Sequence, residues 1–383
     1  MAKLGDICTI YSGTGFPVQY QGTAEGQYPF YKVGDIAKNV TIGNKYLVFC
    51  ENYVEADIVK IIKGTILPSR TVVFAKIGEA VKLNRRAITS CECLIDNNAM
   101  GIAPNESVLT LDYFFHYMCS LRLETLAEAT TVPSVKKSLI EKLDIPLPSL
   151  LEQEKISTML NKVSELITLR REQLAKLDQL VKSRFIELFG DPETNPKGLE
   201  KVLLSDMAEY FNGLTYSPDN VTNDGTIVLR SSNIQNSQLD FADTVRVNSS
   251  IKDKLFVKDN DILMCSRNGS ARLVGKVALI KNLSEPMTFG AFMMIIRSRY
   301  YPYLMTYFQM DAFRRQIATG ATTTINQITG NMLNKISLPL PDMADINEFV
   351  TFVEQTDKSK LAIQQSLDKL ELLKKSLMQE YFG

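Results

Sequence analysis

Apolar residues recur at alternating intervals of three and four positions over residues 152–188, which is the spacing of a coiled-coil seam. Ser149 and Glu152 form the signature of a capped helix start, and Gly190 followed by Pro192 is typical of a helix end. The segment therefore predicts one helix, roughly 55 Å long. Its seam positions are Ile156, Leu160, Val163, Ile167, Arg170, Leu174, Leu177, Val181, Arg184 and Leu188.

The same seam returns 193 positions later, where Asp342 can cap the helix start after Pro341. Two such helices in one chain most simply pack against each other, and the return of the chain through an intervening domain favours antiparallel packing. Three charged seam residues, Arg170, Lys360 and Lys374, either fix the register or extend to solvent at the edge of a shorter seam. The second seam comprises Phe349, Val353, Thr356, Lys360, Ile363, Leu367, Leu370, Lys374, Leu377 and Tyr381.

The regions beside these helices also repeat. TVPSVKKSLIEKLDIPLPSLLEQEKI at 131–156 corresponds to TINQITGNMLNKISLPLPDMADINEF at 324–349, and IELFG at 186–190 returns as QEYFG at 379–383. Short β-type runs broken by Gly, Pro and Asn fill the interiors. We therefore predict an α+β fold, with two globular mixed α/β domains separated by two long antiparallel coiled-coil helices in a pseudo-twofold internal repeat. The predicted parts are a first domain at 1–148, a first helix at 149–190, a second domain at 191–341 and a second helix at 342–383.

Composition excludes several classes of protein. The 383 residues are 45% hydrophobic and include 43 basic and 43 acidic side chains, so the net charge is zero. No apolar run reaches the ~18 residues of a membrane span, and the first residues lack the pattern of a secretory signal. The six cysteines are scattered, which predicts reduced, buried thiols. We expect a cytoplasmic protein.

Catalytic motifs are absent from the sequence. It contains no phosphate-binding loop, no dinucleotide fingerprint and no methyltransferase motif of the [DNS]-P-P-[FYW] type. The only histidine, His116, lies in the apolar run FFHYM, where a packing role is expected. No metal site is expected, because histidines and cysteines do not cluster. The sequence therefore predicts that this chain is not itself an enzyme.

The chain resembles the specificity subunit of type I restriction–modification systems over essentially its whole length. The resemblance is carried by the two junctions that lead into the long helices. It is also carried by the runs SGTGFPVQY at 12–20, YPFYKVGDI at 28–36, VVFAKIG at 72–78 and LNRRAI at 83–88. The second opening, NGLTYSPDN at 212–220, matches the family pattern less well.

The resemblance implies a role in DNA recognition without catalysis by this chain. Each head of such a subunit is a target recognition domain that reads a few base pairs in the major groove of double-stranded DNA. The paired helices set the gap of a bipartite target. Two methyltransferase (M) subunits dock on the helices and junctions, here around Glu152, Gln153 and Arg171, and methylate adenine N6.

The cofactors implied by the resemblance belong to the partner subunits. S-adenosylmethionine serves the methyltransferase, ATP and Mg serve two restriction (R) subunits where these join the complex, and this chain holds no cofactor. The residues alone leave one alternative open, a two-headed protein-binding scaffold without DNA specificity.

Two basic loops carry most of the candidate DNA contacts. Residues 60–90 contain seven basic side chains and one acid, and residues 262–281 contain four basic side chains and no acid. Arg suits guanine, and Asn or Gln suits adenine, because each presents paired hydrogen-bonding groups to a base edge. A solvated surface charge is the alternative for each residue. The candidates are Gln19, Tyr20, Lys76, Lys82, Asn84, Arg85 and Arg86 in the first head, and Arg230, Asn233, Arg267, Asn268, Ser270, Arg272 and Lys276 in the second.

Overall fold

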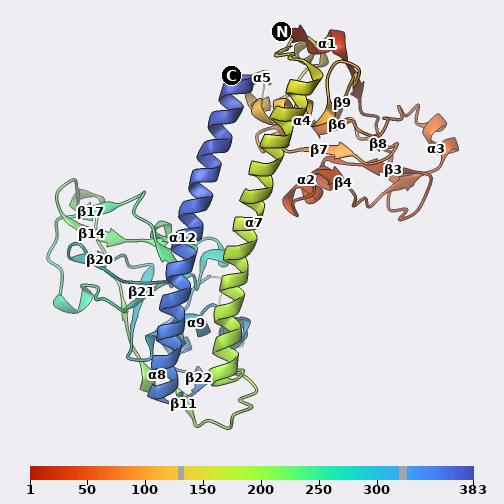
Figure 1. Cartoon of the computed structure of the whole chain (residues 1–383). Coiled ribbons are helices and arrows are strands. Elements are labelled where there is room, and N and C mark those ends of the chain that lie inside the picture. Colours follow the sequence, from red (N-terminus) through yellow and green to blue (C-terminus); the bar gives the residue numbers. More distant parts are fainter. Residues whose placement is uncertain (128–132, 319–325) are drawn as a thin grey trace. The chain divides into compact units, whose positions relative to one another are not determined.

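The computed structural model describes residues 1–127, 133–318 and 326–383. The chain forms two compact units, and each unit combines one globular head with segments of both long helices (Figure 1). Unit 1 comprises Met1–Arg171 and Gln365–Gly383, and unit 2 comprises Glu172–Gln364. Unit 1 is therefore assembled from both ends of the chain, whereas unit 2 is one continuous segment.

The head of unit 1 is built on a five-stranded sheet with the strand order β2-β9-β6-β7-β4. Neighbouring strands pair antiparallel from β2 to β7, and β4 joins the edge parallel to β7. A three-stranded sheet, β5-β3-β8, and a ribbon of β1 with β10 complete the strands. The bounds are β1 Ala2–Lys3, β2 Cys8–Ser12, β3 Tyr28–Tyr31, β4 Tyr46–Leu47, β5 Tyr53–Val54, β6 Val72–Ala75, β7 Arg86–Thr89, β8 Leu94–Ile95, β9 Ala99–Pro104 and β10 Asp144–Ile145.

Helix α4 (Leu111–Ser120) packs against the strands and closes the core of unit 1. Tyr113, Phe114 and Tyr117 recur at the helical spacing of three and four, and all three are buried in one cluster with Phe74. Burial of each of these rings stabilises the head by roughly 2–3 kcal/mol. The shorter helices are α1 Leu4–Ile7, α2 Val33–Thr41, α3 Ala56–Ile61, α5 Leu123–Leu126 and α6 Lys137–Ile140, with 3-10 turns η1 Val18–Tyr20 and η2 Glu79–Val81.

The head of unit 2 repeats the main strand connectivity of unit 1, although β4 of unit 1 and the ribbon β15–β16 of unit 2 have no counterpart in the sheet orders of the other head. Its antiparallel sheet β12-β21-β18-β19 reproduces β2-β9-β6-β7. In the sheet β13-β17-β14-β20, the parallel pair β14–β20 reproduces the parallel pair β3–β8, and the ribbon β11–β22 reproduces β1–β10. The predicted internal repeat of two mixed domains is therefore confirmed.

The elements of unit 2 have the following bounds. The strands are β11 Lys201–Leu203, β12 Glu209–Asn212, β13 Val221–Thr222, β14 Thr226–Leu229, β15 Ile234–Gln235, β16 Gln238–Leu239, β17 Val245–Val247, β18 Ile262–Cys265, β19 Val277–Leu279, β20 Met287–Phe289, β21 Met293–Arg297 and β22 Ser337–Pro339. The helices are α8 Leu204–Met207, α9 Tyr301–Tyr307, α10 Asp311–Ala318 and α11 Gly330–Leu333, with 3-10 turns η3 Pro218–Asn220, η4 Ser231–Asn233, η5 Asp253–Leu255 and η6 Ala271–Leu273.

The two long helices end close to the predicted positions. α7 runs over Leu150–Phe189 and α12 over Met343–Phe382, and each has 40 residues, or about 60 Å of length. The Ser149 hydroxyl accepts a hydrogen bond from the Glu152 N–H at 3.4 Å, and the Glu152 carboxylate accepts one from the Ser149 N–H at 3.0 Å. This is the predicted capping box. Gly190 ends α7 with a φ of +78°.

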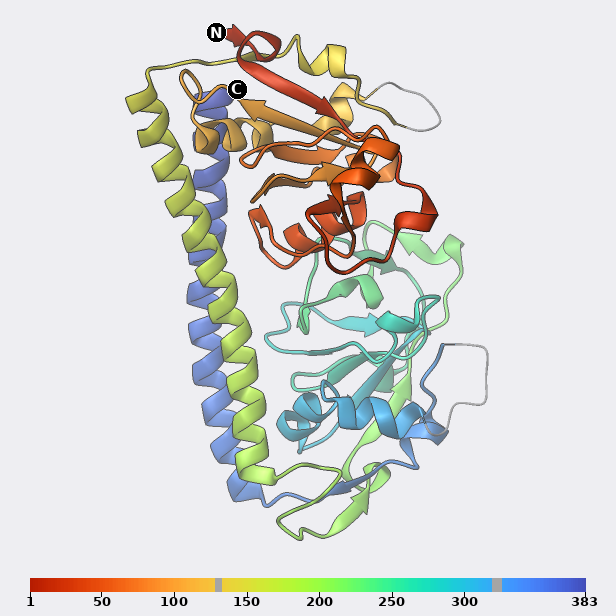
Figure 2. The ribbon, with the colours of Figure 1, turned by 90° about the vertical axis from the view of Figure 1, so that its right-hand side faces the viewer.

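Within each unit, the segments of α7 and α12 run side by side and antiparallel (Figure 1, Figure 2). In unit 2, Asp178 of α7 pairs with Lys360 of α12 at 2.6 Å. Arg184, further along α7, pairs with Glu348, which comes earlier on α12. The partner numbers fall as the α7 numbers rise, so the predicted antiparallel packing is confirmed.

The predicted seam is also confirmed, since every residue assigned to it is buried or part-buried. The charged seam residues differ in depth. The Lys360 side chain is 21% exposed and reaches Asp178, whose side chain is 65% exposed, at the seam edge. Lys374 lies in the seam within unit 1, where burial lowers the pKa of its amine. Lys360 thus extends to solvent as a snorkelling residue does, and it also pairs two defined positions of the helices.

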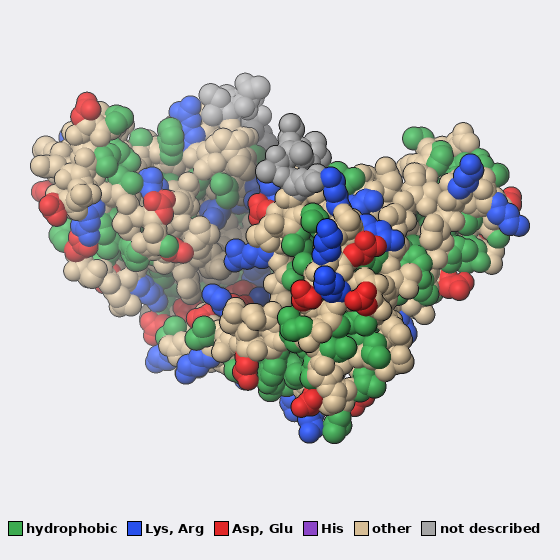
Figure 3. Space-filling view, turned by 90° about the horizontal axis from the view of Figure 1, so that it is seen from above, with side chains coloured by type: hydrophobic (Ala, Val, Ile, Leu, Met, Phe, Trp, Pro, Cys, Tyr) green, Lys and Arg blue, Asp and Glu red, His purple; other side chains and the backbone are tan. Residues whose placement is uncertain are grey.

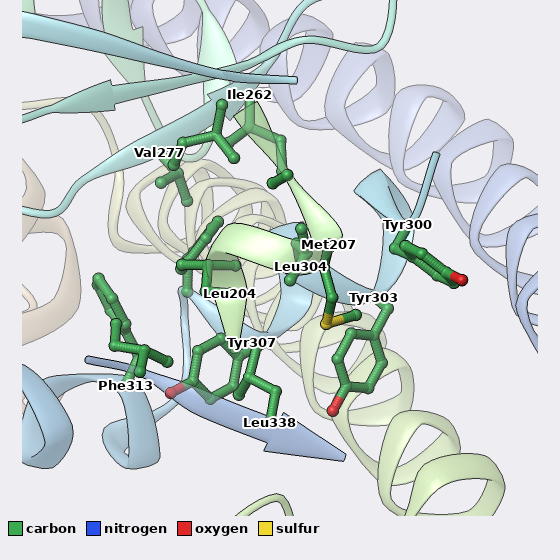
Figure 4. Packing of buried hydrophobic residues seen from close by; sticks show 14 of the residues in the cluster. Leu204, Met207, Ile262, Val277, Tyr300, Tyr303, Leu304, Tyr307, Phe313 and Leu338 are labelled. Carbon is green, nitrogen blue, oxygen red and sulfur yellow. The ribbon is translucent and has the colours of Figure 1, made fainter. Parts of the chain in front are cut away.

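The end of α7 packs into the core of unit 2. The ring centre of Phe189 lies 5.1 Å from that of Tyr303 and 5.4 Å from that of Phe349. Phe185, one turn earlier, stacks on Tyr303 at 5.0 Å. Figure 4 shows Tyr303 and Tyr307 among the buried apolar side chains of this core. The end of the first long helix is therefore part of the hydrophobic core of unit 2.

The end of α12 packs into unit 1 in the corresponding way. Phe382 lies 5.0 Å from Tyr113 and 5.9 Å from Tyr117, measured between ring centres. Phe382 and Phe189 are the repeated phenylalanines of QEYFG and IELFG. The repeated motif thus marks the place where each helix end joins a head.

His116 has the packing role expected of it. The residue is 4% exposed, and its Nε2 lies 2.8 Å from the side-chain oxygen of Asn161. The Asn161 amide donates to Asp112 at 2.8 Å, and Lys45 donates to the same carboxylate at 2.8 Å. Burial lowers the pKa of His116 to about 4, so the ring is neutral at pH 7.

The composition predicted buried, reduced cysteines and no membrane-spanning segment. All six cysteines are free thiols, but only Cys93 and Cys265 are buried, and Cys91 is exposed. The prediction of buried thiols is therefore wrong for Cys91. Among the residues that the structure describes, no helix is long and apolar enough to cross a membrane.

Candidate nucleic-acid interface

The basic loop of unit 1 joins β6 to β7 and is held by backbone hydrogen bonds to two other segments. The Lys76 N–H donates to the Asn98 carbonyl, and the Lys76 carbonyl accepts from the Val135 N–H, both at 2.8 Å. The Gly78 N–H donates to the Pro133 carbonyl at 2.8 Å, and its φ of +79° favours glycine. We call residues 76–86, 96–98 and 133–135 loop cluster 1.

Unit 2 forms the same frame from the loop that joins β18 to β19. The Ser266 N–H donates to the Phe292 carbonyl at 3.0 Å, and the Ser266 carbonyl accepts from the Ile328 N–H at 2.7 Å. The Asn268 N–H donates to the Asn326 carbonyl at 3.4 Å. We call residues 266–276, 290–292 and 326–328 loop cluster 2. One backbone frame therefore carries two different sets of side chains.

The opening loops are tied to these clusters by close backbone approach. A Cβ on Gly13 would lie 1.7 Å from the Asp96 carbonyl oxygen, and one on Gly213 would lie 2.1 Å from the Gly290 carbonyl oxygen. Only glycine fits at either position. The start of the opening loop of unit 1, which leads to the candidate Gln19, is thereby held beside loop cluster 1.

The candidate contact residues fall into three groups by exposure. Exposed side chains can reach a ligand directly, part-buried ones present only some of their atoms, and buried ones cannot reach a ligand while the head stays folded. The exposed residues are Gln19, Lys82, Arg267, Ser270 and Arg272; the part-buried residues are Tyr20, Lys76, Asn84, Arg85, Arg230, Asn268 and Lys276; Arg86 and Asn233 are buried. Contact of any of them with DNA stays a prediction.

The exposed cations of loop cluster 2 are less engaged by carboxylates than Lys82, the exposed cation of loop cluster 1. Arg272 is exposed and forms no ion pair with any residue that the structure describes. The Arg267 guanidinium lies 5.3 Å from the ring centre of Phe292, a cation–π contact that leaves the charge unneutralised. Lys82, by contrast, donates to Glu79 at 2.9 Å. A phosphate therefore competes with a carboxylate at Lys82 but not at Arg272.

Arg86 corrects the expectation that the basic residues of its loop are available to DNA. Its guanidinium donates to the carbonyls of Asn84 at 2.6 Å and Leu121 at 2.8 Å, and burial lowers its pKa to about 10. The Asn84 amide also donates to Leu121, at 3.0 Å, and its oxygen accepts from the Leu123 N–H at 3.0 Å. Both side chains thus tie the loop to the end of α4. Two of the Arg86 guanidinium nitrogens are therefore used inside the head, and a base contact by Arg86 stays a prediction.

Asn233 is a second correction, since it is 1% exposed and caps η4. Its side-chain oxygen accepts from the Arg230 N–H at 2.8 Å, and its amide donates to the Asp243 carbonyl at 2.8 Å. The Arg230 guanidinium in turn pairs with the Asp243 carboxylate at 2.7 Å. Asn233 therefore positions backbone and is not available to an adenine edge.

An arginine outside the predicted loops does in unit 2 what Arg86 does in unit 1. Arg314 of α10 donates from its guanidinium to the Val274 carbonyl. Val274 follows Ser266 at the interval at which Asn84 follows Lys76, so the two carbonyls occupy the same place in their loops. Sequence analysis missed Arg314, because nothing near it in the chain signals a contact with this loop.

One residue named for partner docking lies inside unit 1. Gln153 is fully buried, accepts from the Thr110 N–H at 2.8 Å and donates to the Val108 carbonyl at 2.9 Å. It therefore joins α7 to the segment before α4 and cannot meet a partner. Glu152 and Arg171 are exposed.

Charge is mixed on the one face of the molecule that Figure 3 draws. On the face drawn in Figure 3, Lys and Arg side chains alternate with Asp and Glu, and no continuous basic surface covers it. This agrees with the net charge of zero. Non-specific attraction to phosphates scales with the number of phosphates neutralised, so local loops must supply the contacts of any nucleic-acid complex.

Two heads of one connectivity and two helices of 40 residues define an internally duplicated protein with paired long helices. The family model for the type I restriction modification DNA specificity domain matches this chain twice, over residues 1–179 and 196–375. The chain belongs to that family. The resemblance inferred from the junctions is therefore confirmed.

Two relatives are specificity subunits of type I restriction enzymes. That of EcoKI from Escherichia coli (strain K12) is 26% identical over 183 residues, which are 44% of this chain and 39% of that protein. That of MjaVIII from Methanocaldococcus jannaschii is 21% identical over 412 residues, covering 99% of this chain and 90% of that protein. The first match thus spans less than half of the E. coli protein.

Solved structures show the same fold. The S subunit of a type I restriction–modification system from M. genitalium aligns with a TM-score of 0.56 and 13% identity, over 100% of this chain and 95% of that chain. A chain from a structural study of complex assembly and conformational transition in the type I R-M system aligns with a TM-score of 0.58 and 17% identity, over 100% and 96%. At these identities the likeness concerns the fold alone.

Proposed function

We propose that this chain is the DNA specificity subunit of a type I restriction–modification complex, in which each head reads one half of a bipartite target. The pair of loop clusters carries the proposal. Each cluster holds side chains on the same hydrogen-bonded frame, but the side chains differ between the heads. Recognition of two different short sequences requires a fixed platform with variable side chains.

The side chains divide by chemistry in this proposal. The exposed cations Lys82, Arg267 and Arg272 contact phosphates, which fix the head on the duplex. Amides and guanidiniums that remain accessible, such as Gln19 and Arg85, contact base edges in the major groove. Arg86 and Asn233 act only on the protein's own backbone.

The long helices set the gap between the half-sites and receive the partners. Each helix is about 60 Å long, which exceeds the ~34–36 Å of one turn of DNA that separates half-sites of two-headed binders. Two methyltransferase subunits dock on the helices and junctions and methylate adenine N6 with S-adenosylmethionine. Two restriction subunits with ATP and Mg complete the complex where they are present. No catalytic step is assigned to this chain.

A map of N6-methyladenine in the source cell, with and without the gene, tests the proposal. We expect deletion to remove methylation from one bipartite motif, two short half-sites around a fixed gap. Exchange of residues 191–341 for the head of another specificity subunit then changes one half-site and leaves the other. An unchanged map in a cell with an active partner methyltransferase refutes DNA specificity and favours the two-headed protein-binding scaffold.

A further inference from the structure

In each loop cluster, the backbone carbonyl of one turn residue accepts hydrogen bonds from N–H groups of the basic loop. The Asn98 carbonyl accepts from the Lys76 N–H at 2.8 Å, and the Phe292 carbonyl accepts from the N–H groups of Ser266 at 3.0 Å and Arg267 at 3.1 Å. Asn98 directly precedes β9, and Phe292 directly precedes β21, its counterpart. The two residues therefore occupy one backbone position of the repeated frame, with an amide in unit 1 and a phenyl ring in unit 2.

Both side chains are directed to solvent and are not used by the head itself. Asn98 is exposed, and its side-chain amide has no hydrogen-bond partner among the residues that the structure describes. Phe292 is 58% exposed, and its ring is held beside the Arg267 guanidinium at 5.3 Å. Neither side chain contributes to a buried core cluster, so the stability of the fold does not account for their identity.

A single exposed apolar residue is ordinary on a protein surface. Phe292 differs from that case because its backbone is fixed by two hydrogen bonds from a loop that carries Arg267 and Arg272. A ring placed rigidly beside a guanidinium can enter a groove whose rim is made of phosphates. The backbone of Asn98 is fixed equally, by Lys76 on one side and by the Asp96 carboxylate, which accepts from the Asn98 N–H at 2.9 Å.

We propose that Asn98 and Phe292 are specificity-determining residues, one for each half-site. Asn98 contacts an adenine through the N6 and N7 positions of its major-groove edge, and Phe292 packs on the C5-methyl group of a thymine. Asn suits adenine because its amide donates and accepts side by side, and an apolar ring suits the thymine methyl group. This inference rests on the proposed function and deepens it, because it assigns one A·T pair in each half-site.

The first test compares methylation maps from cells that carry the wild-type gene, a deletion, Asn98→Ala or Phe292→Ala. We expect each substitution to relax one A·T position in one half-site and to leave the other half-site unchanged. Leu203→Ala is the matched control, because it removes an exposed apolar side chain from β11, which lies beside α8 and away from β20 in unit 2 (Figure 1). The control is expected to keep the whole motif.

The second test addresses the thymine methyl group directly. The chain, purified with its methyltransferase partner, is titrated with a duplex that carries the motif and with the same duplex in which uracil replaces the assigned thymine. We expect wild type to bind the uracil duplex about fivefold or more weakly, in keeping with one lost base contact. Phe292→Ala should bind both duplexes alike.

The outcomes separate the two proposals. A deletion that leaves the map unchanged refutes the proposed function, whereas a deletion that removes the motif while both alanine variants keep every position refutes only this inference. If an alanine variant abolishes methylation, Asn98→Gln and Phe292→Leu decide, because they keep the amide or the apolar surface. If Asn98→Gln and Phe292→Leu restore methylation, at the original motif or at a motif with the A·T position relaxed, the inference is supported. If these variants also lack methylation, the inference is overturned.

Discussion

The two heads cap the same loop carbonyl with a guanidinium, but the arginine comes from a different element in each. In unit 1, Arg86 of β7 is 4% exposed and holds the carbonyls of Asn84 and Leu121. In unit 2, Arg314 of α10 is exposed and donates to the Val274 carbonyl. The backbone frame is thus common to the heads, while the side chains that support it are interchangeable. Loop sequence can diverge around such a frame without loss of its shape.

The largest expected effect concerns the helix ends, where the two units differ in burial. Phe189 is 1% exposed in the unit 2 core, whereas Phe382 is only part-buried against unit 1. We expect Phe189→Ala to destabilise unit 2 by about 4 kcal/mol and Phe382→Ala to destabilise unit 1 by about 2 kcal/mol, because the cost follows the cavity left behind.

Hydrogen exchange read peptide by peptide measures these effects, since a single melting temperature does not describe two units. Each substitution should speed exchange in one unit. Equal losses in both units would contradict the assignment of each helix end to one core.

The second prediction tests the interchangeable arginines. Arg86→Ala removes the guanidinium donor of the Asn84 carbonyl, leaves the Leu121 carbonyl with only the Asn84 amide and opens a cavity, so we expect a loss of about 3 kcal/mol in unit 1. Arg314 is itself exposed, so in Arg314→Ala we expect water to replace the guanidinium at the Val274 carbonyl, at a cost of about 1 kcal/mol in unit 2. Exchange rates in loops 76–86 and 266–276 check both values. If Arg314→Ala destabilised its unit more than Arg86→Ala does, the exposure of the arginine would not determine how much it stabilises its loop.

The elements that sequence analysis predicted well are those with local signals. The capping box at Ser149, the left-handed Gly190 and the heptad seam each depend on residues that are close in the chain. The errors arose where adjacent residues look alike. In the run LNRRAI, the sequence alone does not distinguish Arg85 from Arg86. Only Arg86 is turned inward, because β7 starts there.

Other site features require the tertiary structure. Arg314 reaches Val274 across 40 positions of sequence, and no local pattern marks that contact. Asn98 and Phe292 precede strands in ordinary hydrophobic runs, and their shared position becomes visible only through the hydrogen bonds that pin both turns. Asn233 had a usable signal, since Arg230 and Asn233 have the spacing of a capping pair and match Lys32 and Asp35, which form the same box.

The third prediction concerns pH, and it depends on one position at which the two units carry different residues. His116 of α4 is buried with a pKa of about 4, and the matching position in α9 is Thr306, which does not titrate. The folded pKa lies below the ordinary ~6.5, so the unfolded state takes up a proton first as pH falls. We expect unit 1 to lose roughly 2 kcal/mol between pH 6.5 and pH 4, beyond any change in unit 2. Exchange at several pH values measures this loss.

His116→Asn is the control for the pH effect, because it keeps a polar side chain beside Asn161 and does not titrate. The extra acid sensitivity of unit 1 should disappear in this variant. Other groups near the ring, Lys45, Asp112 and Lys374, remain in place. Acid sensitivity that persists without the histidine would assign it to a carboxylate neighbour such as Asp112.

The smallest expected effect distinguishes the two interpretations of Lys360 in the helix seam. Its partner Asp178 is 65% exposed, so the ion pair contributes only about 0.5 kcal/mol, and Lys360→Met should leave the stability of unit 2 nearly unchanged. If Lys360 also fixes the register, the substitution will allow α7 and α12 to slide even though stability is retained. Spin labels on the exposed residues Lys182 and Thr351, both in unit 2, report this as a distance distribution. If wild type and Lys360→Met both show one narrow distance between the labels, the apolar seam alone sets the register of the two helices. If the variant shows a second distance, Lys360 excludes an alternative register.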